Sequence, residues 1–323
     1  MSRPYTGIRL ALLSLVLACS AASAQTYPSK PVRFIVPYST GTATDALSRV
    51  LAQRFSEAFG QQVIVDNQPG ANGIPASAAV AKAAPDGHTI IMFASNHVVN
   101  ASLYAKLPYD TLKDFRPVMR VAFVAFILTV HPSLPVTDLR SFVSFVKARP
   151  GQLNYGSPSN GSPAHLSTEL LKSMAGIDLL HVPYKSAAQA LSDVIGGQIP
   201  VMFVVAPAAI PQIKGGRLRA LGVTSPERLT QVPDIPTIDE SGLKGFELVS
   251  WIGLAGPAGL PGDVVARLSA EITRSLAATE VRDRIRGLGL EIAPMPADEF
   301  AAYMAKEQTR WGEVVRRAGA RLD

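Results

Sequence analysis

The chain has 323 residues, with 31 Lys and Arg against 25 Asp and Glu, a formal net charge of +6, and 47% hydrophobic residues. These values indicate a well-packed globular protein that is long enough for one large or two medium-sized domains. The basic residues are scattered and form no clustered stripe with interleaved aromatic residues, which argues against a nucleic-acid partner.

Residues 1–24 predict a cleavable secretory signal. Two arginines precede an apolar run from Leu10 to Ala18, and an A-x-A cleavage site ends at Ala24. The run is too short to span a bilayer as a resident helix. We expect an exported protein in the periplasm, with a retained membrane anchor or lipidation at Cys19 as the alternatives. Because Cys19 is the one cysteine of the chain, the mature protein would have no disulfide and no thiol chemistry.

Strand-like and helix-like segments then alternate, separated by short turns rich in Gly, Pro and Asp. The pattern predicts strands over residues 32–38, 62–67, 88–95, 121–130, 153–157, 177–184, 199–205 and 217–225. It predicts helices over residues 45–60, 77–84, 136–148, 164–176, 187–197, 263–288 and 297–318. Such alternation is typical of parallel sheets with helices on both faces.

Two α/β lobes are expected at this length, rather than one sheet of many strands. The chain shows no Pro- or Gly-rich linker, so continuous strands should cross between the lobes near Phe126–Leu128 and near Val249–Ile252. These crossings place residues 27–126 and 250–323 in the first lobe and residues 127–249 in the second.

The common catalytic and cofactor motifs are absent from the sequence. There is no phosphate loop and no G-x-G-x-x-G, so we expect no cofactor. The segment Gly156–Gly161, "GSPSNG", misses a nucleophile elbow by one position. The five histidines have no H-x-x-x-H spacing, so a metal site is not predicted either. A hydrolase acting on a small acid or ester is kept as an alternative, although Ser157 and His165 lack an evident third partner.

Four turns rich in Gly, Ser, Thr and Asn follow predicted strands, over residues 37–45, 93–97, 156–166 and 182–191. Open α/β sheets bind ligands at the carboxyl ends of their strands, and helix N-termini offer unpaired amides that suit an anion. The four turns therefore predict a cleft that holds a carboxylate with neutral groups. The alternative is that the hydroxyl and amide side chains only cap the helices.

Fourteen residues of these turns are the candidates for ligand contact: Tyr38, Ser39, Thr40, Gly41, Thr42, Asp45, Ser95, Asn96, Ser157, Asn160, Gly161, Ser162, His165 and Tyr184. Gly41 would let the backbone approach the ligand, or it is a simple turn glycine. Asp45 would stabilise its helix N-terminus first and orient the ligand second. His165 either donates to the ligand or packs in the core. Trp251, near the second crossing, should report closure by fluorescence.

At these turns and beyond them the chain resembles the Bug family, the substrate-binding receptors of tripartite tricarboxylate transporters. The blocks that carry the resemblance run in order from Tyr27 to the C-terminus and include "YPSKPVRFIVPYSTGTATD", "GQQVIVDNQPGANG", "PGQLNYGSPSNGSPAHL", "HVPYK" and "WIGLAGPAGLP". The resemblance implies a type II periplasmic-binding-protein fold, in which two Rossmann-like α/β lobes close on a ligand.

The resemblance also implies a function. The ligand would be a small organic acid: a di- or tricarboxylate, an acidic amino acid or an aromatic acid. Its carboxylate would be held by the turns Tyr38–Asp45 and Ser157–His165. The chain would be a monomeric receptor and not an enzyme, and it would serve a membrane permease or a sensor kinase. An adaptor with no small ligand is a third possibility.

The chain departs from the family pattern in two turns. Ser39 and Thr40 replace two prolines, Thr42 replaces a glycine, and Ser186 replaces the glycine of the V-P-Y-K-G pattern. The extra hydroxyls predict either a ligand with more hydrogen-bonding groups than a plain acid or additional helix caps.

Overall fold

A computed structural model describes residues 27–318 of the chain, so the predicted signal, Cys19 and the cleavage site lie outside the described residues. The strands are β1 (Val32–Val36), β2 (Val63–Asn67), β3 (Thr89–Ala94), β4 (Phe115–Val130), β5 (Asn154–Ser157), β6 (Leu180–Pro183), β7 (Val201–Val205), β8 (Arg219–Val223), β9 (Val249–Pro257) and β10 (Glu291–Pro296). The helices are α2 (Ala43–Phe59), η1 (Ala71–Gly73), α3 (Ile74–Ala81), α4 (Asn96–Leu103), α5 (Leu139–Lys147), α6 (Pro163–Ala175), α7 (Ala187–Ile195), α8 (Ala206–Lys214), α9 (Gly262–Ala277), α10 (Thr279–Gly287) and α11 (Ala297–Ala318).

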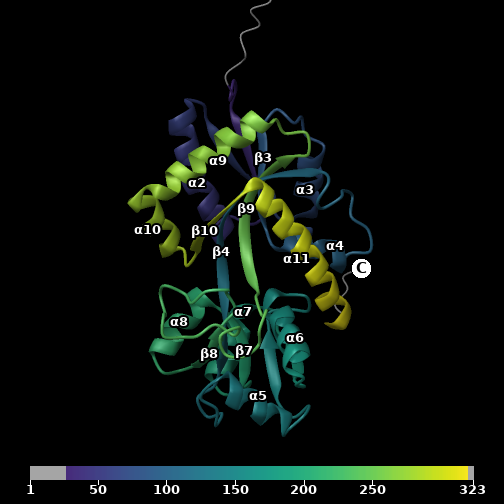
Figure 1. The fold of residues 1–323 in the computed structure, drawn as a ribbon, viewed down its shortest axis with the longest axis vertical. Helices are drawn as coiled ribbons and strands as arrows, with labels where there is room; N and C mark the ends of the chain where they lie inside the picture. The colour runs from purple at the N-terminus through teal and green to yellow at the C-terminus, as the bar shows by residue number, and fades with distance from the viewer. Residues whose placement is uncertain (1–26, 319–323) are drawn as a thin grey trace, which may run out of the picture.

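The strands form one hydrogen-bonded path in the order β2-β1-β3-β9-β4-β7-β5-β6, with β8 and β10 also paired to β4. Figure 1 shows two α/β lobes, one above the other, joined by β4 and the segment that leads into β9. β4 pairs with β9 over Phe115–Ala125 and with β7 and β8 over Phe126–Val130. One continuous strand thus changes partners as it passes from one lobe to the other. The exact lobe boundaries given above stay a prediction.

The sheet is mixed, whereas the alternation of segments predicted parallel sheets. β1, β2 and β3 are parallel, as are β5, β6 and β7, but β4 and β9 are antiparallel to their neighbours. The physical reason is connectivity, because β4 and β9 carry the chain between lobes in opposite directions and so pair antiparallel with each other.

The helix predicted over residues 263–288 is two helices. Ala278 has extended dihedrals (φ −72°, ψ 126°) between α9 and α10. The break turns the chain so that Val281 and Ile285 of α10 are buried with Leu268 and Ile272 of α9. The 3.6-residue period continues on both sides of Ala278, so the sequence pattern alone does not mark this break.

The core is continuous across the lobes on the side of α11. Residues from both lobes, among them Tyr155, Leu166, Trp251 and Trp311, belong to one apolar cluster. α11 packs against α4 of the upper lobe and α6 of the lower lobe (Figure 1). Within residues 27–318, no helix is long and apolar enough to cross a bilayer.

Candidate functional site

The turn between β1 and α2 is held in place by Asp45. Asp45 is 2% exposed, and its carboxylate accepts hydrogen bonds from the Gly41 amide at 2.9 Å and from Asn67 Nδ2 at 2.9 Å. Arg49, one helical turn along α2, pairs with it at 3.0 Å. Burial alone would raise the pKa of Asp45, but the hydrogen bonds from Arg49, Gly41 and Asn67 outweigh burial and hold that pKa below its usual value. Asp45 therefore shapes the turn from behind, in its ionised form.

Two of the four hydroxyl residues that depart from the family pattern, Thr42 and Ser186, cap helices. Thr42 Oγ1 accepts the amide of Asp45 at 3.3 Å and donates to the Ser39 carbonyl at 3.0 Å. Ser186 accepts the Gln189 amide at 3.2 Å as the N-cap of α7. At these two positions, the helix-capping alternative describes the structure, and each hydroxyl satisfies an amide that the first helical turn leaves unpaired.

The turn after β5 rests on two stacked histidines. His165 Nδ1 accepts the Gly161 amide at 3.0 Å, and the rings of His165 and His181 stack at 4.2 Å. Ser157, which is fully buried, makes a 2.7 Å hydrogen bond with His181 Nε2 and lies 3.0 Å from the Ser159 carbonyl. Burial lowers the pKa of His165, and burial together with the neighbouring His165 lowers the pKa of His181 to about 4. Both rings are neutral near pH 7 and support the turn.

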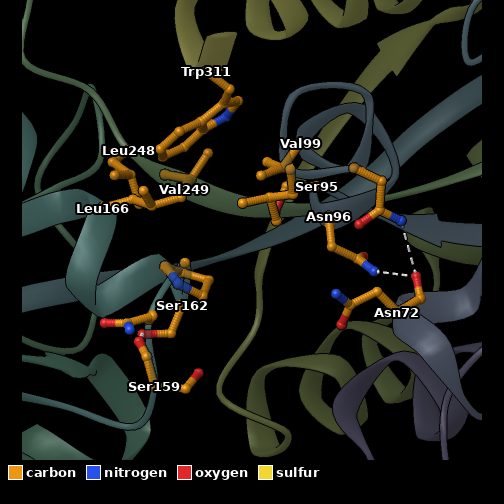
Figure 2. Close-up of a pocket in the computed structure, with 15 residues that line it drawn as sticks. Asn72, Ser95, Asn96, Val99, Ser159, Ser162, Leu166, Leu248, Val249 and Trp311 are labelled. Atoms are coloured by element: carbon orange, nitrogen blue, oxygen red, sulfur yellow. Dashed lines mark hydrogen bonds between the residues drawn. The ribbon is translucent and has the colours of Figure 1, made fainter. Parts of the chain in front are cut away.

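A cavity of about 370 Å³ lies between the lobes, bounded by the turn after β5 on one side and by α4 and the loop at η1 on the other. Figure 2 shows Ser159 and Ser162 facing Asn72 and Asn96 across it. Its lining comprises Asn72, Ser95, Asn96, Val99, Asn100, Leu103, Ser159, Asn160, Gly161, Ser162, Pro163, Leu166, Leu248, Val249 and Trp311. None of these fifteen residues carries a charge.

Three asparagines form the upper polar wall of the cavity. Asn96 accepts a short hydrogen bond from the Tyr38 hydroxyl and donates to the Asn72 carbonyl at 2.8 Å. Asn100 donates to the same carbonyl at 3.1 Å. Asn72 has φ of +52°, a left-handed conformation that asparagine tolerates better than most residues. Tyr38 and Asn96 thus tie the β1 turn to the cavity, although Tyr38 does not line it.

The N-terminus of α4 opens onto this wall. Ser95 makes no side-chain cap; its hydroxyl instead hydrogen-bonds with Ser250 at 3.3 Å. Across the cavity, α6 begins at Pro163, capped by Ser162, whose hydroxyl donates to the Ser159 carbonyl at 2.8 Å. Because that proton is used internally, the Ser162 side chain is not a donor for a ligand in this arrangement. Two helix N-termini nevertheless bound one cavity, and their dipoles favour an anion there.

The turn after β5 carries two side-chain donors that are free to bind a ligand. The Ser159 hydroxyl and the Asn160 side-chain amide make no hydrogen bond with any residue of the described range 27–318, and Asn160 is exposed. Gly161 has φ of +73°, and a Cβ there would lie 3.3 Å from Leu103 of the opposite lobe. This glycine therefore allows the two lobes to meet at the edge of the cavity.

The remaining wall is apolar. Leu166 comes from α6 and Trp311 from α11, while Leu248 directly precedes β9 and Val249 is its first residue. Trp311 is 2% exposed, and its indole nitrogen donates to Glu307 at 3.1 Å, so its ring is fixed. The cavity can thus accept a molecule with polar groups at one end and an apolar body.

Five of the fourteen predicted residues line this cavity: Ser95, Asn96, Asn160, Gly161 and Ser162. Nine do not line it: Tyr38, Ser39, Thr40, Gly41, Thr42, Asp45, Ser157, His165 and Tyr184. The Tyr184 hydroxyl donates to Asp193 at 2.8 Å, and burial and this carboxylate raise its pKa to about 12. Ser39, Thr40 and Gly41 are exposed on the β1 turn. Trp251 is fully buried against Phe300 and its side chain does not line the cavity, whereas Trp311 does, so Trp311 is the better-placed reporter.

Most residues of the cavity wall were not predicted from the sequence, for two reasons. Asn100 lies one helical turn after Asn96, so a search for amides near Asn96 could have found it. Asn72 lies in the distant "PGANG" turn, and only the tertiary structure brings it to Asn96. Leu248 and Trp311 come from distant parts of the chain and carry no local signal. No group of three or more His, Cys, Asp or Glu side chains that could hold a metal ion occurs in the described part of the chain.

Comparisons with known proteins give matches over nearly the whole chain. A family model described as the tripartite tricarboxylate transporter family receptor matches residues 47–320. The UPF0065 protein in the tcbD-tcbE intergenic region of Pseudomonas sp. (strain P51) is 37% identical over 310 residues, which are 95% of this chain and 92% of that protein. Protein BugT of Bordetella pertussis is 34% identical over 319 residues, covering 97% and 98% of the two chains.

Two solved structures are similar over their full length. R. palustris Rpa4515 with adipate is 35% identical, with a TM-score of 0.73, and the match covers 91% of this chain and 98% of that chain. A TctC solute binding protein from Polaromonas with no ligand is 28% identical, with a TM-score of 0.83 and coverage of 90% and 100%.

Proposed function

Because the chain belongs to the tripartite tricarboxylate transporter receptor family, which includes the Bug proteins, we propose that its inter-lobe cavity binds a small carboxylate. The fold is the periplasmic-binding-protein fold that the sequence predicted. The family consists of periplasmic solute-binding receptors, so the chain is a receptor and not an enzyme, and the hydrolase alternative is discarded. Family membership does not by itself identify the ligand class or the partner, which are therefore part of this proposal.

One observation carries the proposal: a cavity without a charged residue lies between the N-termini of α4 and α6. A cationic ligand would find no counter-charge there. An anion would meet the positive ends of two helix dipoles and the unused donors of Ser159 and Asn160. Each hydrogen bond to a carboxylate contributes about 1.5–3 kcal/mol. Three or four of them suffice for a micromolar Kd, which corresponds to about −8 kcal/mol.

Closure of the lobes on the ligand is part of the proposal. The TM-score is higher with the ligand-free Polaromonas protein (0.83) than with the adipate complex (0.73), although the sequence identity is lower (28% against 35%). The higher TM-score to the ligand-free protein supports an open arrangement of the lobes here. On closure, the exposed β1 turn (Ser39, Thr40 and Gly41), with Asp45 behind it, would join the site. A ligand that touches both lobes would shift the population toward the closed form. The closed receptor would then engage a membrane permease or a sensor kinase.

The test is calorimetric titration of the purified protein with succinate, adipate, citrate, glutamate and benzoate, each beside its amide. We expect at least one acid to bind with a micromolar Kd while its amide does not. At 100 times its Kd, that acid should stabilise the fold by about 2.7 kcal/mol. If amides bind as tightly as acids, or no acid binds, the carboxylate proposal is wrong.

A pair of variants locates the site. Asn160→Ala should weaken binding of the acid about tenfold, because a donor to the carboxylate is lost. Gln198→Ala is the matched control, since Gln198 is an exposed amide side chain of the same lobe that does not line the cavity. Equal affinities for the two variants would place the acid elsewhere.

A further inference from the structure

A second cavity, of about 250 Å³, lies in the lower lobe and has an entirely apolar lining. It lies at the carboxyl ends of β5 and β7, beneath the first turns of α7 and α8. Its walls include Phe126, Met202, Val205, Leu191 and Ala208, with Pro158 at the end of β5. A predominantly hydrophobic lining is typical of pockets that hold small molecules.

The position of this apolar cavity relates it to the proposed binding site. Phe126 pairs with Val205 at the point where β4 leaves one lobe for the other. Pro158 and Ala164, which line the apolar cavity, flank the residues 159–163 that line the inter-lobe cavity. The inter-lobe cavity and the apolar cavity are therefore both bounded by the turn of residues 158–164.

The β1 turn is joined to the inter-lobe cavity by the hydrogen bond of Tyr38 to Asn96, and it contributes no residue to the apolar cavity in this arrangement. Figure 1 shows α2 and α8 on one side of the crossing strands, and α4, α11 and α6 on the other. The turn that leads into α2 presents the exposed Ser39, Thr40 and Gly41, and a Cβ at Gly41 would meet no atom within 4 Å. Gly41 is thus not covered by other residues in this arrangement.

We propose that the apolar cavity is a subsite for the hydrocarbon or aromatic end of the ligand, whose acid end is held at the turn of residues 159–162. This inference rests on the proposed function and specifies the ligand as a carboxylate with an apolar body. Size and chemistry fit, because an apolar protein cavity of about 150 Å³ is already enough to bind benzene. A second carboxylate would be penalised there, since burial of an unpaired charge is costly.

The test is titration of the purified protein with propanoate, hexanoate, 3-phenylpropanoate, 3-phenylpropanamide and adipate. Affinity should rise roughly fourfold per methylene group from propanoate to hexanoate. Adipate should bind more weakly than hexanoate, which has the same number of carbons. Ala188→Leu narrows the apolar cavity at an exposed position of α7, so it should leave folding intact and weaken hexanoate and 3-phenylpropanoate at least tenfold. Ala270→Leu, at an exposed position of α9, is the matched control and should change nothing.

The outcomes separate the subsite from the acid site. If short acids and adipate bind as tightly as hexanoate and Ala188→Leu has no effect, the subsite is wrong and the carboxylate proposal stands. If 3-phenylpropanamide binds as tightly as its acid, yet Ala188→Leu weakens both, the subsite stands and the carboxylate proposal is wrong. If none of these molecules binds, both are overturned.

Discussion

Replacing Asp45 by Asn is a direct test of how the β1 turn is built. The carboxylate uses one oxygen for Asn67 Nδ2 and the other for the Gly41 amide, each at 2.9 Å. An Asn side chain keeps one oxygen and places an NH₂ group against the second donor. One hydrogen bond to a charged acceptor is lost and one part-buried donor is left without its partner, so the free energy of unfolding should fall by about 2–4 kcal/mol. The partly exposed Arg49 adds little to this figure.

The assay is chemical unfolding followed by circular dichroism, with Tm as a second measure. For a chain of this size, about 1 kcal/mol shifts Tm by about 2 °C, so Asp45→Asn should melt about 4–8 °C lower. In the double variant Asp45→Asn with Asn67→Asp, Arg49 can still pair with a carboxylate, because it also contacts Asn67 Oδ1 at 2.8 Å. Part of the loss should return. A change below about 0.5 kcal/mol for Asp45→Asn would refute this account of the turn.

Three further predictions follow from the site. Ligand binding should change the fluorescence of the Trp251→Phe variant, which retains Trp311 in the cavity wall, and leave that of Trp311→Phe unchanged; the reverse result would contradict the assignment of Trp311. Ser162→Ala should cost about 1 kcal/mol of stability, because the N-cap of α6 is lost, while Ser162→Thr should retain most of it, as urea midpoints would show. The folded state lowers the pKa of His165 and His181, so unfolding takes up protons below the usual histidine value. Stability should therefore be constant above about pH 6.5 and fall as the pH drops toward 4, and His181→Gln should flatten this fall; an unchanged profile would exclude the stacked pair as its source.

Local patterns made much of the fold predictable. The apolar run over residues 121–130 predicted a strand buried on both faces, and β4 is buried over Ala125–Val130. Gly60 ends α2 in the left-handed conformation, as its place after the last periodic residue indicates. By contrast, α8 was not predicted, because Pro207 and Pro211 interrupt its pattern, and yet Pro207 occupies the first turn where no amide partner is needed.

The sequence by itself determined the alternation of strands and helices, the small-residue turns at the strand ends and the helix caps, because each depends on neighbours within a few residues. Only the tertiary structure decided which of these groups share a cavity. Asn72, Leu248 and Trp311 line the same cavity because of the sheet order and the packing of α11. The hydroxyls of Thr42 and Ser186, by contrast, accept amides of their own helices as N-caps. The inter-lobe cavity is thus a property of long-range packing, which periodicity and composition do not encode at any single position.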